Sequence, residues 1–385
     1  MNTKKILSTI EELILYLEKK KFKGYDPYDA LNIPLPWEKL PRWGPIMFIQ
    51  LFKRFPFNLR NVLGIKREYN PKAMGLFLLA FTRLNIKTGK KEYLDKADFF
   101  FNWLYNNRSQ TYSGSSWGYN FFWISPIRFL KPYTPSSVVT GFICRAIFEY
   151  YKLTGNELAK KCLLGASEFI TNHIPVYKDQ SGLSYSYTPV QEEICYNASL
   201  LAAEILAYSY IIDPNDEIRD KILKACNFVI SRQNEDGSWY YSEKIKTGER
   251  RKQIDFHQGF VLDTLLIIQD LLKMNKKPFD DAIIKGLEFY RNYQFFENGR
   301  SKFRLPKNYP ADIHHQAQGI ITFSRFKDYG KDNSTFALEI ADWTIKNMKS
   351  VKGYFYYRKG SLMSNKIEYI RWGQAWMLLA LTEVL

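Results

Sequence analysis

The chain has 385 residues, 46% of them hydrophobic and 17% aromatic, and its 55 Lys and Arg against 39 Asp and Glu give a formal net charge of +16. This composition excludes a disordered chain, and no apolar run approaches the ~18 residues that a membrane-spanning helix needs. The charge favours an acidic glycan or anionic lipid as partner. Nucleic acid is not expected, because the sequence carries no DNA- or RNA-binding motif.

A polar cluster recurs at intervals of about 60 residues, each time at the start of an apolar helix rich in small residues. The clusters are centred on Lys72, Ser137, Asn197, His257, His315 and Arg371. A fixed period of this length indicates stacked supersecondary units. Between the clusters, half-exposed helices are expected near residues 4–20, 91–106, 157–173, 216–233, 279–295 and 333–349.

Six outer helices and six inner helices predict an all-α fold, a single (α/α)6 toroid over residues 1–385. In this arrangement the first outer helix packs beside the last inner helix and closes the ring. The six cluster residues are expected to point inward and to converge on one axis. A converging ring of polar side chains is typical of an active site.

Long aromatic connections lead from outer to inner helices, over residues 112–135, 177–192, 239–254 and 354–370. Loops longer than ~12–15 residues in a compact domain are usually functional. All four precede a polar helix start, so we expect them to wall the same mouth of the ring. Alternating patterns at residues 185–187 and 354–357 predict small β-hairpins there.

Sequence features also bear on the location of the protein. The four cysteines lie singly in apolar stretches, which is typical of buried, reduced thiols in a cytosolic protein. Residues 1–20 read as an amphipathic helix rather than a signal peptide. Residues 45–55 are apolar and end in basic residues; we expect a packed loop helix, with a membrane-surface helix as the alternative. We therefore predict a cytoplasmic protein. The alternative is a cytoplasmic protein that also contacts the anionic inner face of the membrane peripherally.

Three of the four histidines, His257, His314 and His315, stand at the starts of neighbouring inner helices. Asp255 and Asp312 precede two of them in Asp-x-His patterns and would cap a helix or orient an imidazole. Because histidine titrates near neutral pH, these residues are candidates for an acid/base pair. The alternatives are histidines hydrogen-bonded in a wet pore, or a metal site made by both Asp-x-His pairs. No metal-binding spacing supports the latter, so neither metal nor cofactor is expected.

Aromatic and amide side chains near the mouth suit a sugar, whose C–H faces stack on rings while its hydroxyls bind amides. Tyr119 and Tyr196 are candidate proton donors, and Arg371 offers a planar fork for a carboxylate. An aromatic plug and a purely ring-closing arginine are the structural alternatives. The side chains expected to bind substrate are Trp117, Asn120, Asn197, Trp239, Gln258, Gln316, Arg371, Gln374 and Trp376.

Residues 233–239 match QxxxGxW, the repeat element of squalene and hopene cyclases and protein prenyltransferases. In those proteins the element ties an outer helix to the next loop, so it supports a toroid and says little about the reaction. The cyclases' DxDDT acid and the DDxxD motif are absent from the sequence, as are P-loop and GxGxxG motifs.

Five segments together resemble one protein family: residues 24–32, 117–120, 236–239, 255–260 and 371–376. The family is encoded in bacterial and archaeal capsule, exopolysaccharide and surface-glycan clusters, and its members are sometimes mislabelled delta-aminolevulinic acid dehydratases. The resemblance implies a six-hairpin α/α toroid and a role in surface-polysaccharide biosynthesis, without an established reaction. The architecture is more distantly similar to toroid sugar epimerases, unsaturated glucuronyl hydrolases and polysaccharide lyases.

Three functions remain open from the residues. The first is proton abstraction from a uronate-like sugar, as in an epimerase or lyase, with His257 and either His314 or His315 as base and acid. Tyr119 or Tyr196 would substitute for a histidine, and Arg371, Asn197 and Gln374 would neutralise and orient the carboxylate.

The second function is glycoside hydrolysis by Asp255 and Asp312. The third is non-catalytic binding of a lipid-linked acidic glycan, with residues 48–60 touching the membrane and Trp117, Trp239 and Trp376 stacking sugars.

Overall fold

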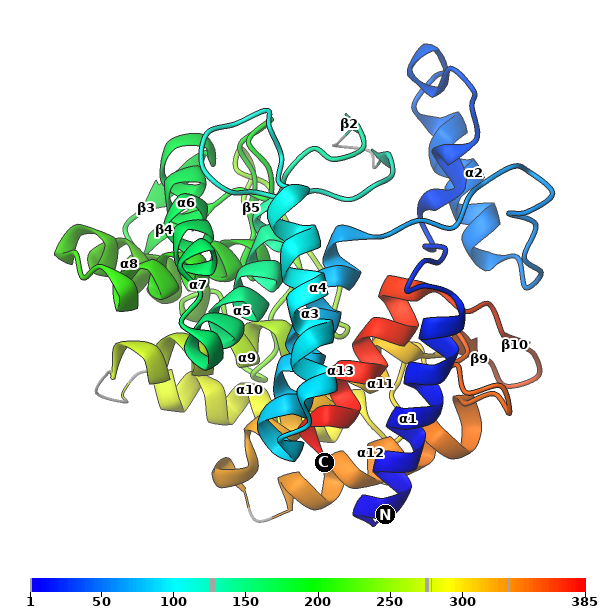
Figure 1. Cartoon of the computed structure of the whole chain (residues 1–385). Helices are drawn as coiled ribbons and strands as arrows, with labels where there is room; N and C mark the ends of the chain where they lie inside the picture. The colour runs from blue at the N-terminus through cyan, green and yellow to red at the C-terminus, as the bar shows by residue number, and fades with distance from the viewer. Residues whose placement is uncertain (1, 125–128, 274–276, 278, 331) are drawn as a thin grey trace.

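The protein is a ring of helical hairpins, seen from the side in Figure 1. The computed structural model describes residues 2–124, 129–273, 277, 279–330 and 332–385. The inner helices are α3 (Pro71–Thr88), α5 (Ser137–Thr154), α7 (Tyr196–Ile212), α9 (His257–Leu272), α11 (Ile313–Arg325) and α13 (Trp376–Glu383), the last preceded by the π-helical turn η4 (Ile370–Ala375). The outer helices are α1 (Thr3–Lys19), α4 (Lys91–Asn106), α6 (Glu157–His173), α8 (Asp216–Ile230), α10 (Phe279–Gln294) and α12 (Asn333–Met348). The predicted (α/α)6 toroid is confirmed.

The two sets of helices differ in burial as their sequences predict. Nearly every residue of the first three turns of α7 is buried, whereas α8 buries only one stripe of apolar side chains. An inner helix packs on both sides against inner neighbours, so it must be apolar all round, while an outer helix keeps one face in water. Gly75 and Gly141 allow close approach of α3 to α5 and of α5 to α7, since a Cβ at either would come within 3 Å of the next helix.

The ring closes between the two ends of the chain. Helix α13 packs against both α11 and α3, and α1 packs against α13, as the sequence predicts. The turn at Gly353 lies against the backbone of α1, where a Cβ would come 2.6 Å from the carbonyl oxygen of Glu12. The closing seam therefore repeats the packing of the other hairpins.

One turn recurs in five of the six connections from an outer to an inner helix, all except the one from α1 to α3. A glycine with positive φ lies against the backbone of the next outer helix, at Gly114, Gly182, Gly237, Gly299 and Gly353. A side chain in the first turn of the inner helix accepts a hydrogen bond from a backbone N–H of the same loop; these side chains are Thr140, Ser199, Gln258, Gln316 and Gln374. The QxxxGxW element is one instance, since Gln233 donates to the carbonyls of Gly237 and Ala282.

We expect Gly237→Ala to destabilise the protein far more than Gly248→Ala. Both glycines have positive φ, but a Cβ at Gly237 would lie 2.3 Å from the carbonyl oxygen of Lys285, whereas a Cβ at Gly248 meets nothing within 4 Å. The first change adds a backbone displacement to the left-handed strain and should cost about 2–4 kcal/mol; the second should cost about 1 kcal/mol. Chemical denaturation of both variants measures the difference, and equal costs would contradict this account of the turn.

The loops of the described chain form four small antiparallel sheets. Two are hairpins: β1 (Trp123–Ile124) pairs with β2 (Phe129–Leu130), and β3 (Val176–Asp179) pairs with β4 (Gly182–Tyr185). The other two have three strands: β6 (Ser242–Glu243) lies between β5 (Ile194–Cys195) and β7 (Arg250–Arg251), and β9 (Arg358–Lys359) lies between β8 (Ala311–Asp312) and β10 (Ser364–Asn365). The hairpin predicted at 185–187 overlaps the observed β3–β4 hairpin only at Tyr185, which ends β4. The hairpin predicted at 354–357 is wrong: the strands begin at Arg358, and Phe355 only bridges Lys349. The described residues also form three short 3₁₀ turns: η1 (Asp29–Asn32), η2 (Trp37–Lys39) and η3 (Lys327–Tyr329).

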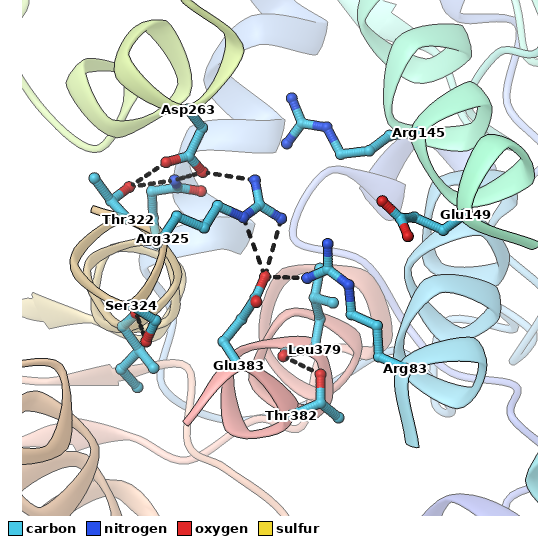
Figure 2. Close-up of polar contacts among 12 residues, drawn as sticks. Arg83, Arg145, Glu149, Asp263, Thr322, Ser324, Arg325, Leu379, Thr382 and Glu383 are labelled. Atoms are coloured by element: carbon cyan, nitrogen blue, oxygen red, sulfur yellow. Dashed lines mark hydrogen bonds and ion pairs between the residues drawn. The ribbon is translucent and has the colours of Figure 1, made fainter. Parts of the chain in front are cut away.

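Charged side chains occupy the ring toward the end where the inner helices finish, from the middle of α5 and α9 to the last residues of α11 and α13 (Figure 2). Arg325 donates to Asp263 and Glu383, and Arg83 also pairs with Glu383. Arg145 holds Glu204 through both carboxylate oxygens, at 2.5 and 2.7 Å, and donates to Thr264. These contacts join all six inner helices, so this end of the axis is occupied by a buried ion-pair network.

A further helix, α2 (Trp43–Arg54), stands outside the ring, above the end where α3 and α13 begin (Figure 1). Its inner face packs through Ile49 and Phe52, as expected of a loop helix. Two buried ion pairs fasten the surrounding segment: Arg60 with Asp29 at 2.7 Å, and Asp26 with Arg371 of η4 at 2.6 Å. In the described part of the chain, no helix combines the length and apolarity needed to cross a membrane.

Candidate functional site

Lys72, at the start of α3, is buried inside the ring. Its ammonium nitrogen lies 3.8 Å from the ring centre of Phe142, 5.3 Å from that of Trp376 and 5.5 Å from that of Phe260. Among the described residues it has neither a carboxylate nor a hydrogen-bond partner. Burial lowers the pKa of Lys72 well below its usual value, and the nearby Arg371 and Arg145 lower it further. The ring faces and the more distant carboxylate of Asp26 stabilise the cation, while its N–H donors have no partner among the described residues and are left for a ligand.

His314, at the start of α11, faces the same interior. Its ring lies 4.6 Å from Trp372, 4.7 Å from Trp376 and 4.4 Å from Phe256, measured between ring centres. Neither imidazole nitrogen has a partner in the described structure. Burial lowers the pKa of His314 well below its usual value, with Lys72 and Arg371 adding to the effect. A neutral imidazole with a free nitrogen can accept a proton.

His257 forms a separate dyad with Asp255. Asp255 Oδ1 lies 2.5 Å from His257 Nδ1 and also accepts from the backbone N–H of His257, so the carboxylate both caps α9 and fixes the imidazole. The neighbouring His257 and Arg304 hold the pKa of Asp255 far below its usual value despite its burial. The Phe256 ring stacks on His257 at 4.3 Å and on His314 at 4.4 Å. Two rings stacked at these distances occupy opposite faces, so Phe256 separates the two histidines.

His315 does not point to the axis, and the expectation of six inward-facing cluster residues is wrong at this position. Its ring stacks on Tyr290 of the outer helix α10 at 5.7 Å and lies edge-on to Phe295 at 5.1 Å. This burial lowers the pKa of His315 to about 4. Of the two adjacent histidines, only His314 belongs to the interior site.

Arg371 lies in the interior, but it already grips a carboxylate of the protein. Its Nε and Nη2 donate to the two oxygens of Asp26 at 2.6 and 2.8 Å. A second carboxylate would have to displace Asp26, so the expected grip on a substrate carboxylate does not fit this geometry. The pair instead anchors η4 and places Trp372 against His314.

Several expected substrate-binding residues serve the loops instead. Gln258, Gln316 and Gln374 each bind a loop backbone N–H and a loop carbonyl. The indole nitrogens of Trp117 and Trp239 donate to the carbonyls of Leu104 and Val229 at the ends of outer helices, and both rings are buried. These side chains therefore hold the turn described above and present no stacking face to a sugar.

Other expected residues lie around the site rather than at its centre. Tyr196 donates to Glu243 of β6 at 2.9 Å, Asn197 accepts from Cys195, and Asn120 accepts from Asn70 at 2.9 Å. Asp312 is fully engaged, because Oδ1 accepts from Trp372 Nε1 and the N–H of His314 while Oδ2 accepts from Arg358 at 2.7 Å. It does not touch the His314 ring.

Tyr119 and Trp376 do reach the interior. Tyr119 lies under the guanidinium of Arg371, 4.8 Å from ring centre to Cζ, and burial raises its pKa, so it stays protonated. It borders a small hollow of about 10 Å³ at the mouth, together with Phe121, Trp123 and Tyr187. Trp376 stacks on Phe260, and its indole nitrogen is buried with no partner among the described residues. A larger hollow of about 440 Å³ beside Phe22 and Glu92 lies on the outer wall at α4, away from these residues.

Sequence reasoning missed three residues of this site. Lys72 was expected to face inward but was not a candidate for binding or catalysis, and Phe256 and Trp372 were not considered. The sequence does contain a signal for Lys72. It directly follows Asn70 and Pro71, which begin the helix, and the next nine residues are all apolar or small, so the lysine lies at the start of a helix with the composition of a buried one. No group of three or more His, Cys, Asp or Glu placed to hold a metal ion occurs within the described residues.

Comparison with known proteins identifies the architecture. No family model matches the chain. A stretch of 111 residues is 29% identical to lanosterol synthase ERG7 of Saccharomyces cerevisiae, covering 29% of this chain and 14% of that protein. The chain therefore spans about one seventh of the length of this curated relative.

Solved structures match over most of the chain. The cellobiose 2-epimerase of Bacillus thermoamylovorans matches with a TM-score of 0.67 at 13% identity, over 84% of this chain and 90% of that one. A possible GH105 member from Klebsiella pneumoniae matches with a TM-score of 0.66 at 12% identity, over 100% and 93%. An unsaturated glucuronyl hydrolase specific for heparin matches with a TM-score of 0.60 at 13% identity, over 83% and 87%. At these identities the likeness shows the α/α toroid fold.

Proposed function

We propose that this protein is a carbohydrate-processing enzyme that transfers a proton at a carbon next to the carboxylate of an acidic sugar, as an epimerase or lyase does. The observation that carries the proposal is the pair of buried, unpartnered polar groups, Lys72 and His314, in one aromatic interior. A buried polar group without a partner costs about 1–3 kcal/mol, and these two share one enclosure, because Trp376 contacts both.

Each group has a role in such a reaction. The ammonium of Lys72 binds the substrate carboxylate and stabilises the negative charge that develops when the neighbouring carbon loses its proton. The neutral imidazole of His314 accepts that proton. In an epimerase a proton then returns to the opposite face of the carbon; in a lyase the electron pair forms a double bond and expels the substituent one carbon further on. Tyr119, kept protonated by burial, or His257 beyond Phe256 supplies the proton needed for either outcome.

The structural neighbours support the proposal at a coarser level, because they include proteins named as a sugar epimerase, a GH105 member and a glucuronyl hydrolase. We further propose that the enzyme acts in surface-polysaccharide biosynthesis. The support for this role is the sequence resemblance to proteins of capsule and exopolysaccharide clusters. The net charge of +16 agrees with an acidic glycan as substrate.

Glycoside hydrolysis by Asp255 and Asp312 fits the geometry less well. A hydrolase needs one carboxylic acid that is protonated near neutral pH, which requires a raised pKa. The pKa of Asp255 is instead strongly lowered by His257 and Arg304, and both oxygens of Asp312 accept hydrogen bonds from the protein.

The test is exchange of a sugar hydrogen with solvent. Uronate-containing oligosaccharides are incubated with the protein in D₂O, and the products are examined by NMR for deuterium at C5 and by ultraviolet absorbance for an unsaturated product. Deuterium at C5 or unsaturation supports the proposal. Binding of the same oligosaccharides without either change would support the non-catalytic binder, and release of reducing ends without exchange would support the hydrolase; either result overturns the proposal.

A further inference from the structure

The segment that surrounds α2 exposes more apolar surface than any other part of the described chain. Ten of the 25 exposed large hydrophobic side chains lie between residues 35 and 63, which we call the projecting segment. They are Leu35, Leu40, Trp43, Met47, Leu51, Phe55, Phe57, Leu59, Val62 and Leu63. Contiguous exposed apolar patches mark interaction sites, whereas isolated apolar side chains on a surface need no explanation.

Helix α2 is apolar on two opposite sides. Ile49 and Phe52 pack inward, while Trp43, Met47 and Leu51, spaced four residues apart, form a line on the outer side. These three side chains are 53–64% exposed. Residues at this spacing share one helix face, so the outer line is a continuous apolar ridge rather than a scatter.

The charges next to the ridge are almost all positive. The only acidic residue of the projecting segment is Glu38, which pairs with Lys131, while Lys39 and Arg54 are exposed and Lys66 follows immediately. An amphipathic helix of this kind, with aromatic and aliphatic residues on one face and basic residues beside them, is typical of a helix lying in a membrane interface. Its 12 residues are too few to cross a bilayer.

The projecting segment also reaches the candidate site. Lys53 of α2 donates to Tyr28 at 2.5 Å, and its ammonium lies 5.5 Å from the ring centre of Trp372, which in turn contacts His314. The β9–β10 hairpin adjoins the segment where Asn365 donates to the carbonyl of Phe55, and it adds the exposed Leu362 and Met363. One side of α2 thus lies at the mouth of the ring while its other side is the apolar ridge.

We propose that the projecting segment docks on an anionic membrane surface, which presents a membrane-anchored acidic glycan to the mouth of the ring. The evidence for membrane docking is the apolar ridge and the basic residues beside it. The identity of the substrate as an acidic glycan rests on the proposed function. Anionic lipid is the occupant favoured over a second copy of the chain, because two copies of this ridge would bring like basic charges together.

Docking is tested by flotation of the full-length protein with vesicles. We expect binding to vesicles containing one third phosphatidylglycerol and at least tenfold weaker binding to pure phosphatidylcholine, with binding to the former lost as salt is raised. Trp43→Ser/Met47→Ser/Leu51→Ser should abolish flotation. Ile86→Ser/Ile211→Ser/Ile284→Ser is the matched control, because it removes three apolar side chains that are 43–55% exposed elsewhere on the ring.

Charge reversal provides the second arm. Lys39→Glu/Arg54→Glu/Lys66→Glu should weaken vesicle binding by at least tenfold, since each basic residue near an anionic surface contributes about fivefold. Lys161→Glu/Lys178→Glu/Lys246→Glu, at exposed positions away from the segment, should leave it unchanged. Equal loss in test and control variants, or dimerisation through the ridge in sedimentation without any flotation, would overturn the docking proposal. Solvent exchange on soluble oligosaccharides should survive in the ridge variant, so that failure of docking is distinguishable from failure of the proposed reaction.

Discussion

Replacement of Lys72 by methionine is expected to weaken binding of acidic sugars by at least about 30-fold while leaving the fold intact or making it more stable. Removing one partner of a buried charge pair costs about 2–5 kcal/mol of binding free energy, a loss of roughly 30- to 5,000-fold in affinity. In the free protein the ammonium is enclosed by Phe142, Phe260 and Trp376 without a carboxylate. A methionine of similar length fills the same space without a buried charge, so the free energy of unfolding should not fall.

Calorimetry with an acidic and a neutral oligosaccharide, together with thermal unfolding, measures both effects. The exposed Lys91→Met on α4 serves as the control and should change neither. Because burial lowers the pKa of Lys72 and a bound carboxylate raises it again, binding should take up protons. Affinity for the anion should then fall as the pH rises through the lowered pKa. Unchanged affinity in Lys72→Met, or binding without proton uptake, would contradict this assignment.

Replacement of His314 by glutamine is expected to reduce solvent exchange by about 10²–10⁴-fold, the range that a positioned acid or base contributes. Sugar affinity should change by less than tenfold, since the glutamine retains polar atoms in the same place. The adjacent His315→Gln is the matched control, because that side chain packs against Tyr290 and Phe295 rather than the interior. A comparable loss of exchange in a folded His315→Gln protein would refute the choice of His314.

The sequence predicts the ring because the signal for it is periodic. Polar clusters at a constant interval identify the inner helices, and the outer helices follow from their mixed periodicity. A side chain's direction is a finer property: adjacent residues of a helix point about 100° apart, so the pattern at 314–315 cannot tell which histidine faces the axis. The same limit applies to Gln258, Gln316 and Gln374, whose polar groups turn back to the preceding loop.

Contacts between residues far apart in the sequence cannot be predicted from it for a different reason. The carboxylate that neutralises Arg371 belongs to Asp26, 345 residues away, and only the closed ring brings the two together. Lys72 was overlooked because lysine is usually a surface residue. Lys72 is notable because none of the described residues forms an ion pair with it. The sequence cannot show that a lysine will lack an ion-pair partner in the folded protein.

The ion-pair network in Figure 2 limits the route that a glycan can take. Arg145, midway along α5, and Arg325 and Glu383, at the ends of α11 and α13, occupy the axis toward the end where the inner helices finish, so the ring is a cup rather than a tunnel. A polymer cannot thread through a cup; one terminus or one short repeat unit must enter, react and leave by the same rim. Successive reactions along a long chain would therefore require release and rebinding after each event, and products should appear in a distributive rather than a processive order.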